Sequence, residues 1–181
     1  MYPFLRFGAA IRRARRQPPL GLFDAHLSRH RCLPWDLDPW IELNNGRTLT
    51  LYDLGRIPMA WRNGLAQVAR DRGWGITVAG VSVRYRRRIR AFERVTMLSR
   101  LLGWDARFQY LEQSLWKGDD CANQVLIRWA VTGPEGIVPP PQVAIAMGHD
   151  GASPELPDWV QAWIAAEATR PWPPVLTPEG L

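Results

Sequence analysis

Residues 35–46 read WDLDPWIELNNG and hold three carboxylates and two neighbouring amides in one short segment. Asparagine is a preferred helix cap, because its side-chain oxygen accepts the unpaired N–H groups of a helix's first turn. We therefore predict that Asn44 or Asn45 caps a helix beginning near Gly46. Asp38 and Glu42 would then lie in the loop facing the positive end of that helix, where a carboxylate is stabilised.

Hydrophobic periodicity and turn residues predict the elements around this segment. A first strand is expected over 24–34, the capped helix over 46–56, and a second helical piece over 64–72 that Gly73 ends. Gly55 and Pro58 should weaken or kink the first helix. Four strand-like runs with turn signals between them follow, at 76–87, 91–103, 107–117 and 121–132, with a bulge expected at Gly80.

The end of the chain has a different character. Short helices are expected over 142–147 and 157–168, and the Pro-rich tail over 170–181 is expected to be extended or disordered. This divides the chain into a basic N-terminal arm (1–23), one compact domain (24–147), and a C-terminal helix with its tail (148–181). The element order is that of an α+β protein.

The segment resembles the signature Asp-x-x-Gly-His-Val-Asn-Asn of the hotdog-fold acyl-CoA thioesterases, because Asp38, Asn44 and Asn45 match it in register. Within that family the resemblance is to the proteins similar to 4-hydroxybenzoyl-CoA thioesterase. Ile41 stands where the signature has Gly, and Glu42 where it has His. The element order supports the same resemblance over roughly residues 25 to 145. It implies an antiparallel sheet wrapped around a central helix, and a C-terminal helical extension would follow it.

The resemblance also implies an activity, the hydrolysis of acyl-CoA thioesters to free acid and CoA. Asp38 would act as base or nucleophile, and N–H groups at the helix N-terminus would polarise the thioester carbonyl. Asn45 would orient water or fix the loop. Glu42 would add a second carboxylate near Asp38, and Asp53 is an alternative catalytic carboxylate on the helix. The residues expected to contact substrate are Asn44, Gly46, Tyr52, Arg86, Arg87 and Arg88.

Positive charge comes almost entirely from arginine in a chain of formal net charge +6. Strand alternation would place Arg84, Arg86, Arg88 and Arg90 on one face. We predict that part of this run binds the phosphates of CoA, because a guanidinium can contact two oxygens at once; a solvated turn is the alternative. Only Tyr85 and Phe92 could supply stacking rings nearby, so nucleic acid is not expected as a partner.

The N-terminal arm combines Phe4, Phe7 and Ile11 at helical spacing with several arginines. Its apolar residues precede its charges, which is the wrong order for a secretory signal. The arm should either pack on the domain or make weak contact with a membrane surface. The two cysteines and three histidines lack metal-site spacing, so we expect no metal or cofactor. We expect a cytoplasmic protein, and one that is peripheral at the inner membrane if the arm binds lipid.

Ten tryptophans favour self-association, and the resemblance implies a homodimer or a dimer of dimers with a site between subunits. The second functional hypothesis is a hotdog protein that binds acyl groups or a membrane without catalysis, motivated by Glu42 and the basic arm. A hotdog dehydratase or hydratase is set aside, because no histidine lies between His30 and His149.

Overall fold

A computed structural model describes residues 2–176 of the chain. Its helices are α1 (Phe4–Ala14), α2 (Asn45–Arg62), α3 (Leu65–Asp71), α4 (Pro140–Ala146) and α5 (Asp158–Ala168). Its strands are β1 (His26–Arg31), β2 (Gly75–Tyr85), β3 (Arg94–Trp104), β4 (Gln109–Lys117), β5 (Asp120–Gly133) and β6 (Gly136–Val138).

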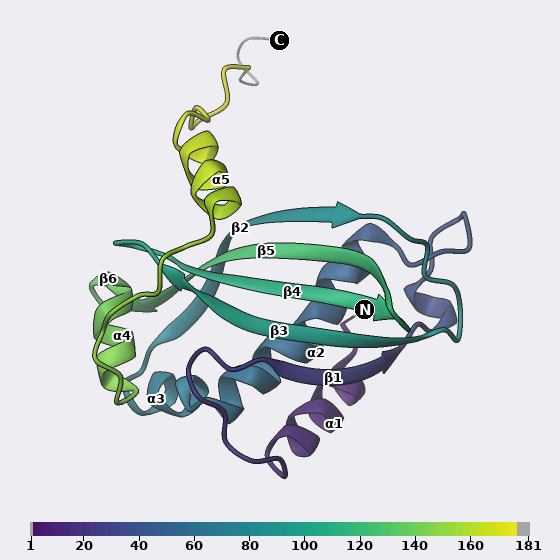
Figure 1. Cartoon of the computed structure of the whole chain (residues 1–181), viewed down its shortest axis with the longest axis horizontal. Helices are drawn as coiled ribbons and strands as arrows, with labels where there is room; N and C mark the ends of the chain where they lie inside the picture. The colour runs from purple at the N-terminus through teal and green to yellow at the C-terminus, as the bar shows by residue number, and fades with distance from the viewer. Residues whose placement is uncertain (1, 177–181) are drawn as a thin grey trace.

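One antiparallel sheet in the order β1-β3-β4-β5-β2 forms the body of the protein, and β6 pairs with β5. The sheet curls around α2, which crosses its inner face (Figure 1). This arrangement is the hotdog fold, so the predicted fold class is confirmed. Strand β2 forms one edge of the sheet and β1 the other.

The core lies between α2 and the inner face of the sheet. Leu51, Leu54 and Met59 of α2 are buried against Leu111 and Ile127 of the central strands. Contact is close at Gly55, where an added Cβ would overlap Met97 Sδ and lie 2.7 Å from Ser99 Oγ. Glycine at this position therefore lets the helix reach the sheet.

The predicted end of the central helix near Arg56 is wrong. Helix α2 continues through Pro58 to Arg62, and Pro58 is itself buried. A proline inside a helix costs about 3 kcal/mol. Burial of the flanking residues Leu54, Met59 and Ala60 offsets this cost, a tertiary effect that local propensity does not contain.

The sheet matches the sequence prediction closely. All five expected strands form, and the bulge occurs between Val78 and Gly80 as predicted. Two details differ. Trp104 belongs to β3 instead of the following turn, and β6 was not predicted because three residues are too few to show a period-two pattern.

Helix α1 packs along α2, so the N-terminal arm rests on the domain. Phe7 packs against the core, whereas Phe4 is exposed and contacts the ring of Tyr2. Arg15 lies over the ring of Trp61, with its guanidinium carbon 4.1 Å from the ring centroid. Across residues 2–176, no helix has both the length and the apolar character required to cross a bilayer.

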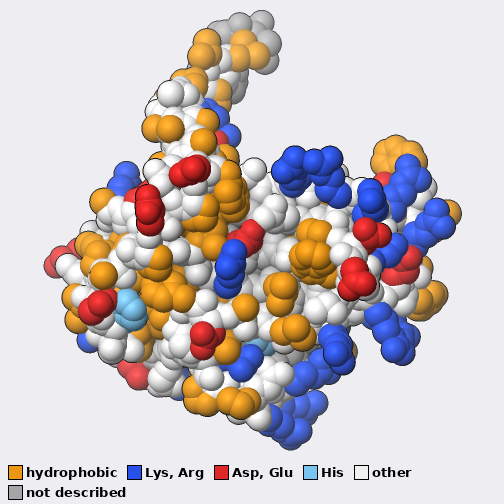
Figure 2. All heavy atoms as spheres, viewed as in Figure 1, with side chains coloured by type: hydrophobic (Ala, Val, Ile, Leu, Met, Phe, Trp, Pro, Cys, Tyr) orange, Lys and Arg blue, Asp and Glu red, His pale blue; other side chains and the backbone are white. Residues whose placement is uncertain are grey.

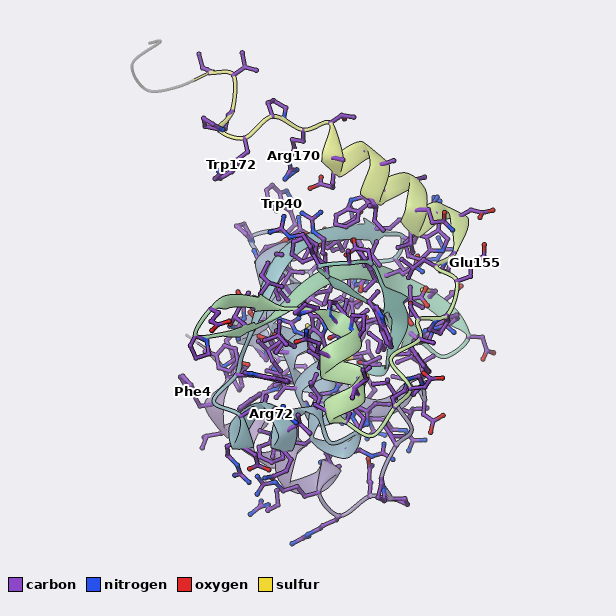
Figure 3. All side chains as sticks on the ribbon, turned by 90° about the vertical axis from the view of Figure 1, so that its left-hand side faces the viewer. Phe4, Trp40, Arg72, Glu155, Arg170 and Trp172 are labelled. Carbon is purple, nitrogen blue, oxygen red and sulfur yellow. The ribbon has the colours of Figure 1, made fainter. Side chains whose placement is uncertain are left out.

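Helix α5 covers part of the outer face of the sheet. Val160, Trp163 and Ile164 pack there against Tyr110 and Leu126, in a cluster separate from the main core. The segment then runs away from the sheet, as Figures 1 and 3 show. The expected Pro-rich tail begins at residue 170, and its last part, 177–181, lies outside the described residues.

Candidate active site

The loop between β1 and α2 ends in the predicted cap. The Asn44 side-chain oxygen accepts hydrogen bonds from the N–H groups of Gly46 (2.9 Å) and Arg47 (3.1 Å). Asn44 is therefore the cap, and Asn45 is the first helical residue. Because the cap uses these two donors, the Asn45 N–H and the positive end of the helix remain to act on a ligand.

Asp36 is the fully buried carboxylate of this loop. It accepts hydrogen bonds from Arg6 (2.7 Å) and Arg47 (2.9 Å), and from the Leu33 N–H (3.1 Å). These contacts join α1, the loop and the first turn of α2. Sequence reasoning did not identify this role, because one of the partners, Arg6, is distant in the chain.

Asp38 is partly buried and organises a tight turn. Its Oδ1 accepts from the N–H groups of Trp40 (2.9 Å) and Glu42 (3.4 Å). The main chain adds a bond from the Asp38 N–H to the Glu42 carbonyl (2.9 Å). Ile41 within this turn has φ of 60°, so the position where the family signature has Gly adopts a glycine-like backbone.

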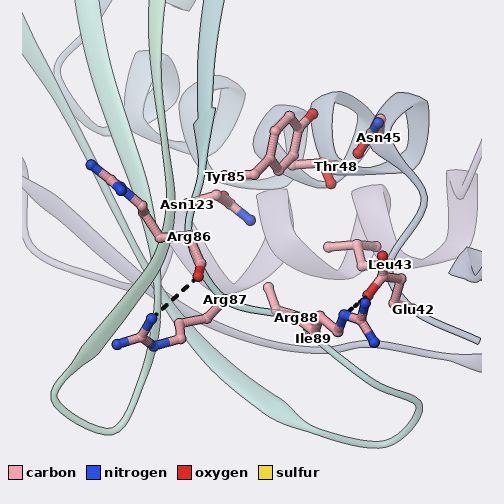
Figure 4. Close-up of a pocket in the computed structure, with 10 residues that line it drawn as sticks. All are labelled: Glu42, Leu43, Asn45, Thr48, Tyr85, Arg86, Arg87, Arg88, Ile89 and Asn123. Atoms are coloured by element: carbon pink, nitrogen blue, oxygen red, sulfur yellow. Dashed lines mark hydrogen bonds and ion pairs between the residues drawn. The ribbon is translucent and has the colours of Figure 1, made fainter.

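A cavity of about 200 Å³ opens beside the N-terminus of α2 (Figure 4). It lies between the Asp38 loop, the first turns of α2, the end of β2 and the Arg86–Arg88 loop. Its lining residues are Glu42, Leu43, Asn45, Thr48, Tyr85, Arg86, Arg87, Arg88, Ile89 and Asn123. Glu42 forms an ion pair with Arg88 on one side of it, at 2.9 Å (Figure 4).

Asn123 reaches the cavity from β5 and is held from behind by Tyr52. The Tyr52 hydroxyl donates to Asn123 Oδ1 at 2.5 Å, and both residues are buried. This bond leaves the Asn123 amide nitrogen directed into the cavity (Figure 4). Burial raises the pKa of Tyr52, so the hydroxyl stays protonated and continues to donate.

The structure brings some predicted site residues together and separates others. Glu42, Asn45 and the three arginines line the cavity. Asp38, Asn44, Gly46, Tyr52 and Asp53 are not among its lining residues, although the first four support its walls. The alternation expected for Arg84–Arg90 is wrong beyond Tyr85, because β2 ends there and a loop follows.

Asp53 lies on the side of α2 that faces α1. It forms an ion pair with Arg56, and burial raises its pKa while the Arg56 charge opposes that shift. Its neighbour Tyr2 comes from the N-terminal segment. In this chain Asp53 therefore belongs to the contact between two helices.

Five cavity residues were not predicted as site residues: the apolar Leu43 and Ile89, and the polar Thr48, Tyr85 and Asn123. Thr48 is buried and donates from its hydroxyl to the Asn44 carbonyl (3.1 Å). Burial raises the pKa of Tyr85, and its hydrogen bond with Thr48 opposes the shift. Local sequence patterns gave no signal for them, because the site depends on which strand ends meet α2. Residues 2–176 contain no cluster of His, Cys, Asp and Glu that could hold a metal ion.

A family model described as the thioesterase-like superfamily matches residues 32–164. The chain belongs to this superfamily. The matched range includes the Asp38 loop, α2, strands β2 to β6 and most of α5, so the family assignment covers the whole candidate site. The predicted family is thus confirmed.

Relatives within the superfamily include proteins named THEM6. The Xenopus laevis protein is 34% identical over 165 residues, covering 89% of this chain and 78% of the relative. The Danio rerio protein is 31% identical over 126 residues, covering 68% of this chain and 62% of the relative. These names state no activity.

Solved structures show the same fold at low identity. A probable thioesterase from Bartonella henselae has a TM-score of 0.58 at 17% identity, covering 64% of this chain and 98% of its own. A DHNA-CoA thioesterase from Staphylococcus aureus has a TM-score of 0.58 at 13% identity, covering 80% of this chain and 91% of its own. A third neighbour, SAV2348 from Staphylococcus aureus, was solved in complex with CoA, with a TM-score of 0.58 at 8% identity, covering 78% of this chain and 94% of its own.

Proposed function

We propose that this protein hydrolyses acyl-CoA thioesters to free acid and CoA. The observation that carries the proposal is the cavity at the N-terminus of α2, where a carboxylate, an amide donor and three arginines face one space. Membership of the thioesterase-like superfamily supports the reaction class. The names of the solved neighbours support CoA thioesters as the substrate class.

Polarisation of the thioester carbonyl is assigned to Asn123 and the N-terminus of α2. The Asn123 amide nitrogen is a fixed donor, because Tyr52 holds the other end of the amide. Preorganised donors stabilise the negative charge that develops on a carbonyl oxygen during attack. The Asn45 N–H and the helix dipole act in the same direction.

Water activation is assigned to a carboxylate of the Asp38 loop. Asp38 is the base that the sequence predicts, whereas Glu42 is the loop carboxylate that lines the cavity. Arg88 neutralises Glu42 in the free protein. Phosphate groups of CoA bound by Arg86, Arg87 and Arg88 would compete for this arginine and release Glu42 to accept a proton from water.

The test compares matched, nearly isosteric variants in an acyl-CoA hydrolysis assay that detects the free thiol. Loss of the catalytic base should lower kcat by about a hundredfold or more. We expect this loss in Glu42→Gln if Glu42 is the base, and in Asp38→Asn if the sequence prediction holds. Asp53→Asn is the control, because this carboxylate faces α1. Near-normal turnover in both Glu42→Gln and Asp38→Asn would contradict the proposed chemistry.

A non-catalytic acyl-CoA-binding protein is the second candidate. Both loop carboxylates are already engaged, Glu42 by Arg88 and Asp38 by two N–H groups. Binding of a non-hydrolysable acyl-CoA thioether, measured by calorimetry, combined with no thiol release from acyl-CoAs of different chain lengths, would favour this candidate.

We also propose that the protein is a homodimer through the β2 edge, or a dimer of dimers. Ile76, Val78 and Val81 are exposed along this strand, and an open apolar edge favours strand pairing. Tyr85 connects this edge to the cavity, so a partner here would border the site. A fully active monomer in analytical ultracentrifugation at micromolar concentration would contradict a shared site.

The cytoplasmic location, with weak contact to the inner membrane through the N-terminal arm, stays a proposal. Among residues 2–23, Phe4 and Leu5 are the large apolar side chains that are exposed. Removing the whole arm would also remove Arg6 from the buried Asp36. Substitution of Phe4 and Leu5 is therefore a cleaner test than truncation.

A further inference from the structure

Two loops at one end of the molecule together expose four large apolar side chains. One loop links β1 to α2 and the other links β2 to β3. They lie side by side, because the Phe92 N–H donates to the Cys32 carbonyl (2.7 Å) and the Leu43 N–H to the Ile89 carbonyl (2.8 Å). We call the exposed set the aromatic tip: Trp35 (65% exposed), Trp40 (77%), Ile41 (68%) and Phe92 (61%).

Two members of the aromatic tip occupy an unfavourable backbone conformation. Ile41 has φ of 60° and Phe92 has φ of 65°, and they are the non-glycine residues with positive φ among residues 2–176. This region favours Gly or Asn and penalises bulky and β-branched side chains. Each residue thus holds an apolar side chain in water at a cost in stability. Strain of this kind is typical of functional contacts.

The surface beside the aromatic tip is strongly basic. Arg31 and Arg94 are direct cross-strand partners, a pairing of like charges that destabilises a sheet. With Arg29 they line a groove of about 530 Å³ that also contains Trp116 and has no acidic lining residue. Among the salt bridges of the described chain, none involves these three arginines.

Further arginines flank the tip on the Arg86–Arg90 loop. Figure 2 shows Lys and Arg side chains gathered with hydrophobic ones at this end of the molecule. Trp40 stands clear of the body of the sheet in Figure 3. Exposed tryptophan and phenylalanine bordered by arginine is the composition that partitions into the headgroup region of an anionic bilayer.

We propose that the aromatic tip docks on an anionic lipid surface, with Trp35, Trp40, Ile41 and Phe92 entering the interface and the flanking arginines contacting headgroup phosphates. A second copy of this chain fits the surface less well, because symmetric contact across it would bring the arginines together. The proposal does not depend on thioester hydrolysis. It would place the Glu42–Arg88 cavity next to the membrane, because Ile41 adjoins Glu42.

The test measures binding of the full chain to phosphatidylcholine–phosphatidylserine vesicles, with pure phosphatidylcholine vesicles as the reference. The tip variant is Ile41→Asn with Phe92→Asn. Asn tolerates positive φ, so this variant should unfold at the same temperature as the wild type or higher. Its vesicle affinity should fall about tenfold or more, because two apolar side chains no longer enter the interface.

A matched control variant, Val175→Asn with Leu176→Asn, removes two exposed apolar side chains near the C-terminal end and should retain binding. The arm variant, Phe4→Asn with Leu5→Asn, removes the weak contact proposed for the arm and should lose less binding than the tip variant. Arg31→Gln with Arg94→Gln should weaken binding at low salt and change it little at high salt. Retained binding in the tip variant, or loss only in the arm variant, would overturn the proposal. A wild-type protein that does not bind anionic vesicles would also overturn the proposal. A tip variant that turns a dimer into a monomer would show that a second copy covers this surface.

Discussion

Replacing Asp36 with Asn tests whether the buried carboxylate holds the site loop in place. The carboxylate is fully buried and contacts Arg6 at 2.7 Å and Arg47 at 2.9 Å. Asn keeps the size of the side chain but removes the negative charge that Arg6 and Arg47 share. Removing one partner of a buried ion pair costs about 3–5 kcal/mol.

The two arginines are themselves about one-fifth exposed, with side-chain exposures of 20% and 19%, so water can partly replace the lost partner. We therefore expect the lower end of the range, about 3 kcal/mol. For a domain of this size, that loss lowers the melting temperature by about 6–12 °C.

The assay is differential scanning calorimetry of wild type and Asp36→Asn, with urea denaturation as a second measure. Asp38→Asn is the matched control. Its amide oxygen can still accept from the Trp40 N–H, so the loss should stay below about 1 kcal/mol. A melting temperature for Asp36→Asn within about 2 °C of wild type would refute the structural role of the carboxylate.

Two further predictions concern stability. Burial, as the largest cause, lowers the pKa of both His26 and His30 to about 4. Between about pH 6.5 and pH 4 the unfolded chain therefore binds more protons than the folded chain. The free energy of unfolding should fall as the pH falls through this range. The combined His26→Asn and His30→Asn variant should flatten the dependence of unfolding free energy on pH in that window, and an unchanged slope would contradict the assigned pKa values. Gly55→Ala should destabilise the fold by about 1–3 kcal/mol in urea denaturation, because the added Cβ meets Met97 and Ser99. If Gly55→Ala is as stable as the wild type while Gly55→Val is destabilised, the sheet can move away from α2 to make room for a methyl group.

The sequence was most informative where local chemistry determines structure. Asn44 caps α2 because a cap needs only its own neighbouring N–H groups, and β4 and β5 follow from alternation that any sheet would show. Residues whose role depends on distant partners could not be found this way. Asp36 became a buried ion-pair centre because Arg6 on another helix reaches it.

The candidate site shows the same division. Glu42 and Asn45 were predicted from the signature, and Arg86, Arg87 and Arg88 from the run of arginines that follows a predicted strand. Asn123 was missed because its position in the site depends on β5 meeting α2, and its amide is oriented by the Tyr52 hydroxyl. Pro58 was misread because a sequence window records the cost of proline but not the tertiary burial that offsets it.

Helix α5 limits how copies of this protein can assemble. By packing Val160, Trp163 and Ile164 over Tyr110 and Leu126, the chain occupies part of the convex side of its own sheet. Two copies that stacked back to back on that side would have to accommodate these helices. Helix α5 therefore hinders assembly through that side, and a chain shortened before α5 would expose Tyr110 and Leu126.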